Sequence, residues 1–352
     1  MSTKTMHAIM QTAYGEPSKV LKLLTVPLPA FDESSNKLLL RVKAVSINPV
    51  DGMVIRGKLN IVWTDPMPAP VGYDVSGVVV KAGKGTGFKE GDEVYGFLSL
   101  NRPGSFAEYC TVPARNCALK PTSLSHEEAA CLPLVGATAI QALQRHSGPK
   151  DTAFIPGGLG GVGSVMLQLA KPYSGFKHTI TTASTAKVEV VKQHIRDVDV
   201  VIDYKKVEPA TVIPAHSCDF VLDQFGKPAS YAQYVRKPPP SSAEGKPSII
   251  SVSAPPDAKK FQQAWETRGS LPLRIGLNLI DWWTRLWIPG WIHYDSFGAL
   301  QSASDLKILA DLADHGKLKP VIDKVFPMGQ AVEAIALAET KPAGKVVIRM
   351  SD

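Results

Sequence analysis

The stretch Thr152-Ala-Phe-Ile-Pro-Gly-Gly-Leu-Gly-Gly-Val-Gly-Ser-Val-Met-Leu-Gln-Leu-Ala-Lys171 decides the fold. It opens with a strand-like run at residues 152–155, continues with a glycine cluster at 157–163 and ends in a helix-like run at 164–171. A G-x-G-x-x-G pattern between a strand and a helix is the context in which this motif predicts a dinucleotide site. About 150 residues precede it, so we expect a whole domain before the cofactor site.

Each glycine of the motif has an expected physical role. Gly158 permits the tight turn, Gly160 lets the backbone approach a pyrophosphate, and Gly163 lets the helix pack closely on the strand. The helix N-terminus offers unpaired N–H groups and a positive dipole end to the phosphates. We therefore expect cofactor contacts from Gly158, Gly160, Gly161, Val162 and Gly163.

The composition is that of a globular enzyme with two domains. The 352 residues suffice for two sizeable cores, and 44% hydrophobic with 20% charged residues is ordinary for such a protein. The net charge is +7, but lysines and arginines are scattered rather than gathered in one block. We therefore expect no nucleic-acid partner.

The cysteines and the apolar runs point to the cytoplasm. Cys110, Cys117, Cys131 and Cys218 form no C-x-x-C pair, and we interpret them as buried free thiols in a reducing compartment. The N-terminus has no long apolar segment of a secretory signal, and no run of 18 apolar residues occurs. We expect a cytoplasmic protein.

The chain shows two successive patterns of predicted secondary structure. The first 130 residues hold short strand-like runs between Gly, Pro and Asp turns, which predicts an all-β, barrel-like domain. Ser125-His-Glu-Glu128 resembles a capping box at the start of a helical stretch. From Thr152 strands and helices alternate, which predicts a parallel sheet with helices on both faces, and residues 236–245 form the clearest loop.

The chain resembles the medium-chain dehydrogenase/reductase superfamily, and within it the zinc-free branch of quinone oxidoreductases and enoyl reductases. Short fragments carry the resemblance, and their order and spacing are specific although each alone is weak. Besides the glycine loop they are Ser46-Ile-Asn-Pro-Val-Asp51, Gly72-Tyr-Asp-Val-Ser-Gly77, Gly91-Asp-Glu-Val-Tyr-Gly96, Gly104-Ser-Phe-Ala-Glu-Tyr109, Leu132-Pro-Leu-Val-Gly-Ala-Thr138, Val200-Val-Ile-Asp-Tyr204, Gly316-Lys-Leu-Lys-Pro320 and Ala343-Gly-Lys-Val-Val347.

The resemblance implies an architecture of two domains. Residues 1–130 and 299–352 would form a GroES-like β-barrel catalytic domain, and 131–298 an inserted Rossmann domain with a doubly wound parallel sheet. The active site would lie in the cleft between them. Many members dimerise by joining the last Rossmann strand across a two-fold axis, so a homodimer through a strand near 291–297 is a candidate state.

The sequence predicts no metal site. Zinc members of the superfamily carry ligands at three places that match Asn48, Tyr73 and Leu134, and none of these is a good zinc ligand. The lobe that holds a structural zinc would lie between Gly96 and Gly104, where this chain has no cysteine. Chemistry would then rely on the nicotinamide, with the protein supplying position and polarity.

The cofactor is predicted to be NADPH. A site that selects NAD places an acid about 20 residues after the glycine loop, where this chain reads Thr181-Thr-Ala-Ser-Thr-Ala-Lys187 without one. Ser184 and Lys187 would instead accept a 2′-phosphate, and the resemblance adds Tyr204 as a third contact. The alternative is that Lys187 is a solvated lysine at a helix start.

Few residues are candidates for chemistry at the acceptor. Reduction of a quinone or enone places charge on an oxygen, which needs a donor or a water nearby. Asn48 is the first candidate and Tyr73 the second, although a turn at Asn48-Pro49 and a packed aromatic at Tyr73 are equal alternatives. The Tyr or Lys donor of some enoyl reductases is missing, and Arg56 is at best a partial substitute.

Other site positions come from the resemblance. Thr138 resembles the family threonine beside the nicotinamide ribose, and Gly226 and Ser251 would line the nicotinamide pocket at two strand ends. Asp51 and Asp74 are interpreted as structural residues that cap turns.

A tryptophan-rich segment at 277–291 leaves several interpretations open. It could be a core-covering helix, a lid over an apolar substrate, a dimer interface or a membrane-surface helix. The first is favoured because aromatic stripes at helical spacing are usually buried. Membrane contact is the least favoured, because the segment is short and is interrupted at Pro289-Gly290.

These observations predict an NADPH-dependent, zinc-independent oxidoreductase that transfers hydride to a small apolar quinone or α,β-unsaturated carbonyl. One alternative is a trans-acting enoyl reductase of secondary metabolism, or a non-redox isomerase or cyclase on the same fold. An alternative of another class is a cofactor-binding protein with little turnover that associates with a membrane or a partner.

Overall fold

The protein folds into two compact units. The computed structural model describes residues 4–60, 62, 64–101, 104–239 and 245–350. Unit 1 comprises Met1–Ala137 and Gln301–Asp352, and unit 2 comprises Thr138–Leu300. The division therefore falls a few residues from the predicted boundaries, and its first point lies inside α4 (Pro133–Gln144). Within the predicted loop 236–245, residues 240–244 lie outside the described part of the chain.

Unit 2 is built on a parallel six-stranded sheet, as predicted from the alternating pattern. The strands occur in the order β11-β10-β9-β12-β13-β14, and every neighbouring pair is parallel. This is the doubly wound order of a dinucleotide-binding domain. The strands are β9 (Thr152–Pro156), β10 (His178–Ala183), β11 (Val200–Asp203), β12 (Phe220–Asp223), β13 (Ser248–Ser251) and β14 (His293–Ser296).

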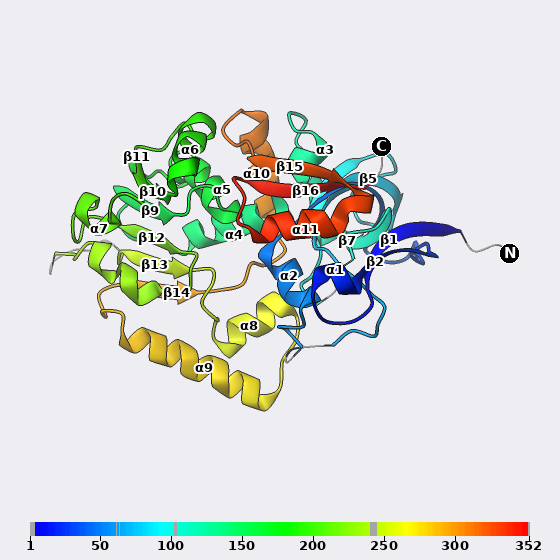
Figure 1. Cartoon of the computed structure of the whole chain (residues 1–352), viewed down its shortest axis with the longest axis horizontal. Helices are drawn as coiled ribbons and strands as arrows, with labels where there is room; N and C mark the ends of the chain where they lie inside the picture. Colours follow the sequence, from blue (N-terminus) through cyan, green and yellow to red (C-terminus); the bar gives the residue numbers. More distant parts are fainter. Residues whose placement is uncertain (1–3, 61, 63, 102–103, 240–244, 351–352) are drawn as a thin grey trace. The chain divides into compact units, whose positions relative to one another are not determined.

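Helices follow the strands of this sheet (Figure 1). After β10 a 3-10 turn, η2, continues into α6, and the Lys187 N–H closes this turn by donating to the Ser184 carbonyl. The helical elements are α5 (Gly161–Ala170), η2 (Thr185–Lys187), α6 (Val188–His194), α7 (Pro209–Val212), η3 (Pro228–Tyr234), α8 (Ala258–Trp265) and α9 (Leu271–Leu286).

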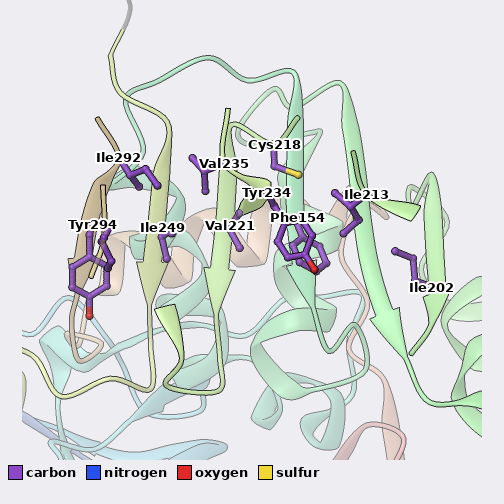
Figure 2. Packing of buried hydrophobic residues seen from close by; sticks show 11 residues of the cluster. Phe154, Ile202, Ile213, Cys218, Val221, Tyr234, Val235, Ile249, Ile292 and Tyr294 are labelled. Carbon is purple, nitrogen blue, oxygen red and sulfur yellow. The ribbon is translucent and has the colours of Figure 1, made fainter. Parts of the chain in front are cut away.

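The core of unit 2 lies along its sheet. A cluster of buried side chains runs from Ile202 on β11 through Phe154, Val221 and Ile249 to Tyr294 on β14, as Figure 2 shows. Such apolar, β-branched strands are typical of a parallel sheet that is covered on both faces. The rings of Phe154 and Tyr234 pack edge to face within it.

Unit 1 is β-rich, as the sequence predicts for its N-terminal part. One sheet has the order β15-β16-β3-β5-β6-β8, with β7 also on β3, and a second has the order β2-β1-β4. Its strands are β1 (Thr5–Gln11), β2 (Leu21–Pro27), β3 (Lys37–Ser46), β4 (Ala69–Pro70), β5 (Asp74–Ala82), β6 (Glu93–Phe97), β7 (Tyr109–Pro113), β8 (Cys117–Leu119), β15 (Ile322–Pro327) and β16 (Lys345–Arg349).

The two ends of the chain meet in unit 1 through β3 and β16. These strands pair antiparallel, with Val347 opposite Ser46, which brings Lys345 to the end of β3. The capping box predicted at Ser125 is confirmed at the start of α3. The helical elements of the unit are α1 (Pro17–Val20), α2 (Pro49–Ile55), η1 (Ala114–Asn116), α3 (His126–Ala130), α10 (Ala303–Asp314), η4 (Met328–Gln330) and α11 (Ala331–Glu339).

Candidate functional site

The glycine loop joins β9 to α5, as predicted, but the turn residue is Gly157. Gly157 has φ of +74°, in the left-handed region that favours glycine, whereas Gly158 does not. Two hydrogen bonds hold the turn: Gly157 N–H donates to Thr182 Oγ1 at 3.1 Å and Gly158 N–H to the Thr182 carbonyl at 3.1 Å. The turn role predicted for Gly158 therefore belongs to Gly157. Gly158 is instead a close-packing position, where a Cβ would lie 2.6 Å from Thr181 Oγ1.

Gly160 and Gly163 differ in what surrounds them. A Cβ on Gly163 would lie 2.4 Å from the Gly157 carbonyl oxygen, which makes it the close-packing glycine that the motif predicts. Gly160 is exposed, and its nearest neighbour would be 3.2 Å from such a Cβ. It precedes α5 as the N-cap, so the unpaired N–H groups of the first turn, at Gly161, Val162 and Gly163, begin beside an open backbone surface.

This surface suits a pyrophosphate group. Gly160 is exposed at the N-cap of α5, where the helix dipole favours an anion. The residues present therefore fit the phosphates of a dinucleotide.

The ends of β10 and β11 bring the predicted 2′-phosphate residues together. Ser184 caps η2, whose last residue is Lys187. Tyr204 N–H donates to the Ala183 carbonyl at 3.1 Å, so Tyr204 adjoins the same turn. The Tyr204 ring is half exposed, with the Lys205 ammonium 5.6 Å from its centroid.

One acid, Asp203, also lies beside this turn. Asp203 ends β11, and its carboxylate accepts hydrogen bonds from Thr185 Oγ1 at 3.1 Å and from Lys205 N–H at 3.0 Å. It lies at the end of β11, whereas an NAD-selecting acid is expected at the end of β10. Its carboxylate is engaged with its own turn, as Asp commonly is.

The end of β12 also borders the glycine loop. The Gln224 amide donates to the Pro156 carbonyl at 2.5 Å. The half-exposed Phe225 ring lies against the loop, since a Cβ on Gly157 would be 3.1 Å from its Cζ. Gly226 follows with φ of +69°, and Ser251 Oγ donates to Asp223 Oδ2 at 2.7 Å.

A second polar cluster lies buried in unit 1 around Asp74. The Asp74 carboxylate accepts hydrogen bonds from Ser46 Oγ at 2.8 Å, from Asn48 Nδ2 at 2.7 Å and from Leu134 N–H at 2.9 Å. Burial raises the pKa of Asp74. These hydrogen-bond donors and a nearby ammonium group act in the opposite direction and lower the pKa.

The ammonium group belongs to Lys345 on β16. Its Nζ donates to Asn48 Oδ1 at 2.6 Å and to the Ile47 carbonyl at 2.9 Å, and it lies 3.8 Å from Asp74 Oδ2. Lys345 is only 6% exposed. The Asn48 amide is thus fixed at both ends, by the ammonium at its oxygen and by the carboxylate at its nitrogen.

Asp51 completes this cluster on α2. Its Oδ2 accepts the Asn48 N–H at 2.7 Å, which confirms the structural capping role predicted for it. Its Oδ1 is buried and has no hydrogen-bond partner among the described residues. Burial raises the pKa of Asp51 to about 7, and the neighbouring charge of Asp74 adds to the shift.

Known proteins resemble this chain over nearly its whole length. Residues 34–122 match the alcohol dehydrogenase GroES-like domain family and residues 175–348 the zinc-binding dehydrogenase family. A 2-methylene-furan-3-one reductase of Solanum lycopersicum is 34% identical over 97% of this chain and 79% of its own length. The chain belongs to the medium-chain dehydrogenase/reductase superfamily. It is an enzyme, an oxidoreductase of this superfamily.

Two further similarities place the chain within the superfamily. An NADPH-dependent alkenal/one oxidoreductase of Arabidopsis thaliana is 33% identical over 98% of this chain and 80% of its own length. The solved structure of a quinone oxidoreductase from Coxiella burnetii superposes with a TM-score of 0.77 at 28% identity, covering 99% of this chain and all of that one.

The positions that match zinc ligands in other superfamily members hold a different arrangement here. Asn48 Nδ2 and Leu134 N–H both donate to Asp74, and Tyr73 is the residue before Asp74. Amide and aliphatic side chains do not suit zinc. In the part of the chain that the structure describes, no group of three or more His, Cys, Asp or Glu side chains could hold a metal ion.

Tyr73 and Arg56 are occupied by other groups of unit 1. Tyr73 is fully buried, and its hydroxyl donates to the Leu100 carbonyl at 2.9 Å. Burial also raises its pKa. Arg56 pairs with Glu339 and, at 2.9 Å, with Glu16. These contacts favour the packed-aromatic alternative for Tyr73 and a structural ion pair for Arg56.

Sequence reasoning missed Lys345 and Phe225 as site residues. Lys345 lies in the fragment Ala343-Gly-Lys-Val-Val347. A lysine at the start of an apolar strand, Lys-Val-Val-Ile, is the pattern that indicates a buried, paired ammonium. Phe225 follows Asp223 and Gln224 at a strand end, where ligands of such sheets bind. Thr138 is buried on α4, as Ser251 is on β13.

Proposed function

We propose that this enzyme uses NADPH to reduce α,β-unsaturated carbonyls or quinones without zinc. The observation that carries the proposal is the open backbone surface at Gly160, with Ser184, Lys187 and Tyr204 at the neighbouring strand ends. The 34% and 33% identical relatives are named as reductases of a methylene-furanone and of alkenals or enones, which supports this substrate class.

The residues of unit 2 would divide the binding of the dinucleotide. The first turn of α5, with Gly158, Gly160 and Gly161, would bind the pyrophosphate. Lys187 would pair with the 2′-phosphate, and Ser184 and Tyr204 would donate hydrogen bonds to it. Thr138, Gly226 and Ser251 remain proposed contacts of the nicotinamide half. The bound dinucleotide supplies the hydride.

Unit 1 would contribute the polar group that meets the acceptor. Asn48 is our candidate, because Lys345 and Asp74 fix its amide and so preorganise its dipole. The Asn48 Nδ2 also carries a second hydrogen besides the one that it donates to Asp74. Tyr73 is a weaker candidate because its single hydroxyl proton is donated to the Leu100 carbonyl, and Arg56 because two carboxylates, of Glu339 and Glu16, hold its guanidinium. The proton that completes enone reduction would then come from water.

Oxidation of the reduced nicotinamide, followed by its absorbance with a panel of enones and quinones, tests this function. We expect turnover with members of at least one class, and a lower KM for NADPH than for NADH. Tight NADPH binding without oxidation by any acceptor would refute the reductase function and is what an isomerase or cyclase predicts.

A further inference from the structure

Helix α9 carries an unusually exposed apolar surface. The side chains of Trp282, Trp283 and Trp287 are 57%, 57% and 63% exposed, and five large aliphatic side chains of the same helix are also exposed. The expectation that this tryptophan stripe is buried in a core is therefore wrong for α9. Of the four tryptophans in 277–291, Trp291 packs against the core cluster of unit 2.

The exposed side chains form one continuous face. At about 100° per residue, the exposed apolar residues from Leu271 to Trp287 span about half of the helix circumference. The three charged residues of α9, Arg274, Asp281 and Arg285, lie on the other half. We call the apolar half, which includes Leu271, Ile275, Leu279 and the three indoles, the α9 face.

The opposite half attaches the helix to unit 2. Leu277 is buried, and Asn278 Oδ1 accepts the N–H of Ala258 at the start of α8 at 3.0 Å. Arg285 pairs with Asp281 at 2.8 Å and donates to the Tyr294 carbonyl on β14 at 2.9 Å. Figure 1 shows α9 in yellow along the outer margin of unit 2. The orientation of the α9 face is therefore fixed by specific contacts.

The α9 face is larger than a chance apolar patch. A buried Trp covers roughly 200 Å², so three indoles at these exposures alone present roughly 350 Å². The largest apolar patch of a typical monomer is of the order of 300–600 Å², and the aliphatic side chains of the face come in addition. Such a surface marks an interaction site.

The exposed charged residues close to α9, before it, on α8 and after its end, are mostly positive. Arg268 is exposed just before the helix, and Lys259 is exposed on the neighbouring α8. Lys246 is exposed near the other end, where its Nζ donates to the Gly290 carbonyl at 2.8 Å. Glu266 is the exposed acid among these residues. Three cations against one anion complement a negatively charged surface.

We propose that the α9 face binds an anionic lipid bilayer, with the helix lying in the plane of the headgroups. A facing helix from a second copy would cover a stripe, whereas a bilayer surrounds the whole exposed half of a helix. Indole rings favour the boundary between headgroups and acyl chains. The 16 residues of α9 are too few to span a bilayer, and no helix among the described residues is long and apolar enough to do so.

Vesicle co-sedimentation of the full chain tests this proposal. The probes are vesicles of phosphatidylcholine alone and of phosphatidylcholine with phosphatidylglycerol. We expect the wild type to sediment with the anionic vesicles and to show a blue shift of its tryptophan emission. Replacing all three indoles, Trp282→Ser, Trp283→Ser and Trp287→Ser, should reduce the partition coefficient more than tenfold, which is about 1.4 kcal/mol or more.

A matched variant replaces three exposed apolar residues outside α9. Leu23→Ser, Leu119→Ser and Val212→Ser change side chains that are 48%, 58% and 44% exposed. This variant should bind vesicles like the wild type. Circular dichroism and NADPH oxidation with a water-soluble acceptor should be unchanged in both triple variants, which separates lost lipid binding from lost folding.

Three results would overturn the proposal. In the first, the wild type stays in the supernatant at every lipid concentration. In the second, the tryptophan variant binds vesicles as well as the wild type. In the third, the wild type does not bind vesicles, and analytical ultracentrifugation without lipid finds it as a dimer and the tryptophan variant as a monomer. That result would assign the α9 face to contact with a second copy of the chain.

Discussion

Lys345 shows how one side chain organises a buried cluster in unit 1. Its ammonium is nearly inaccessible and binds Asn48 Oδ1 and the Ile47 carbonyl, with Asp74 at 3.8 Å. Removing one partner of a buried ion pair leaves an uncompensated charge.

We expect Lys345→Met to lower the free energy of unfolding by about 3–5 kcal/mol, measured by denaturant titration. The double variant Lys345→Met/Asp74→Asn should recover part of this loss, because both charges are then gone. Lys22→Met, at an exposed lysine of β2, is the matched control and should change stability by less than about 0.5 kcal/mol. An equal effect of the two single variants would contradict the role assigned to Lys345.

Asp51 predicts a pH dependence of stability. Burial raises its pKa in the folded chain to about 7, above the ordinary aspartate value of 3.8. The folded state therefore binds more protons than the unfolded state between these values, so the Asp51 contribution to stability falls as pH rises from about 4 to about 7.

The variant Asp51→Asn should remove that contribution. The wild type should lose unfolding free energy relative to the variant across this window, at no more than about 1.4 kcal/mol per pH unit. Urea titrations of both proteins at a series of pH values measure the difference. A constant difference from pH 4 to pH 7 would rule out titration of Asp51 as its source.

Lys187 is the residue on which the proposed cofactor preference depends. We expect Lys187→Ala to weaken NADPH binding by about tenfold, since a charge-assisted hydrogen bond contributes about 1.5–3 kcal/mol. NADH binding should stay the same, because NADH has no 2′-phosphate. Dissociation constants from nicotinamide fluorescence check this, with Lys192→Ala, on α6, as the control. Unchanged discrimination between the two cofactors would refute the assignment.

Among the elements, the β9–α5 connection separates two functions of glycine. A Cβ at Gly163 would meet the Gly157 carbonyl at 2.4 Å, whereas a Cβ at Gly160 has its nearest neighbour at 3.2 Å. Gly163 therefore serves close packing, whereas Gly160 is the exposed glycine at the N-terminus of α5.

We expect Gly163→Ala to destabilise the protein by about 1–3 kcal/mol, as overpacking of a close contact does. Gly160→Ala should lower the thermal unfolding temperature less than Gly163→Ala does, because its Cβ would lie 3.2 Å rather than 2.4 Å from the Gly157 carbonyl oxygen, and it should weaken NADPH binding. Thermal unfolding and fluorescence titration of both variants separate the two effects. Full NADPH affinity in Gly160→Ala would show that no phosphate approaches the backbone there.

The sequence predicted elements better than the contacts between distant elements. The alternation after Thr152 predicts the parallel sheet because each run is long and strongly patterned. The ion pair between Arg56 and Glu339 joins residues 283 positions apart, and no local pattern encodes it. The α9 face was misjudged because a helical stripe of apolar residues looks the same whether it faces a core or the solvent.

At the scale of the whole molecule, the chain passes between the two units only at Ala137–Thr138 and Leu300–Gln301. We therefore expect differential scanning calorimetry to resolve two transitions. NADPH at about a hundred times its dissociation constant should stabilise unit 2 by about 2.7 kcal/mol. Lys345→Met should lower the other transition. A single transition that both changes shift equally would show that the units unfold together.

The burial of the four cysteines affects how the protein would react with its proposed substrates. All four are among the described residues, are free and are buried, as predicted. Burial raises the pKa of Cys110 and Cys131 to about 12 and that of Cys218 to about 11, and it also raises that of Cys117. Enones and quinones alkylate thiolates, and a protonated, buried thiol is a poor nucleophile. Under the proposed function, this burial would protect the enzyme from covalent inactivation by its own electrophilic substrates.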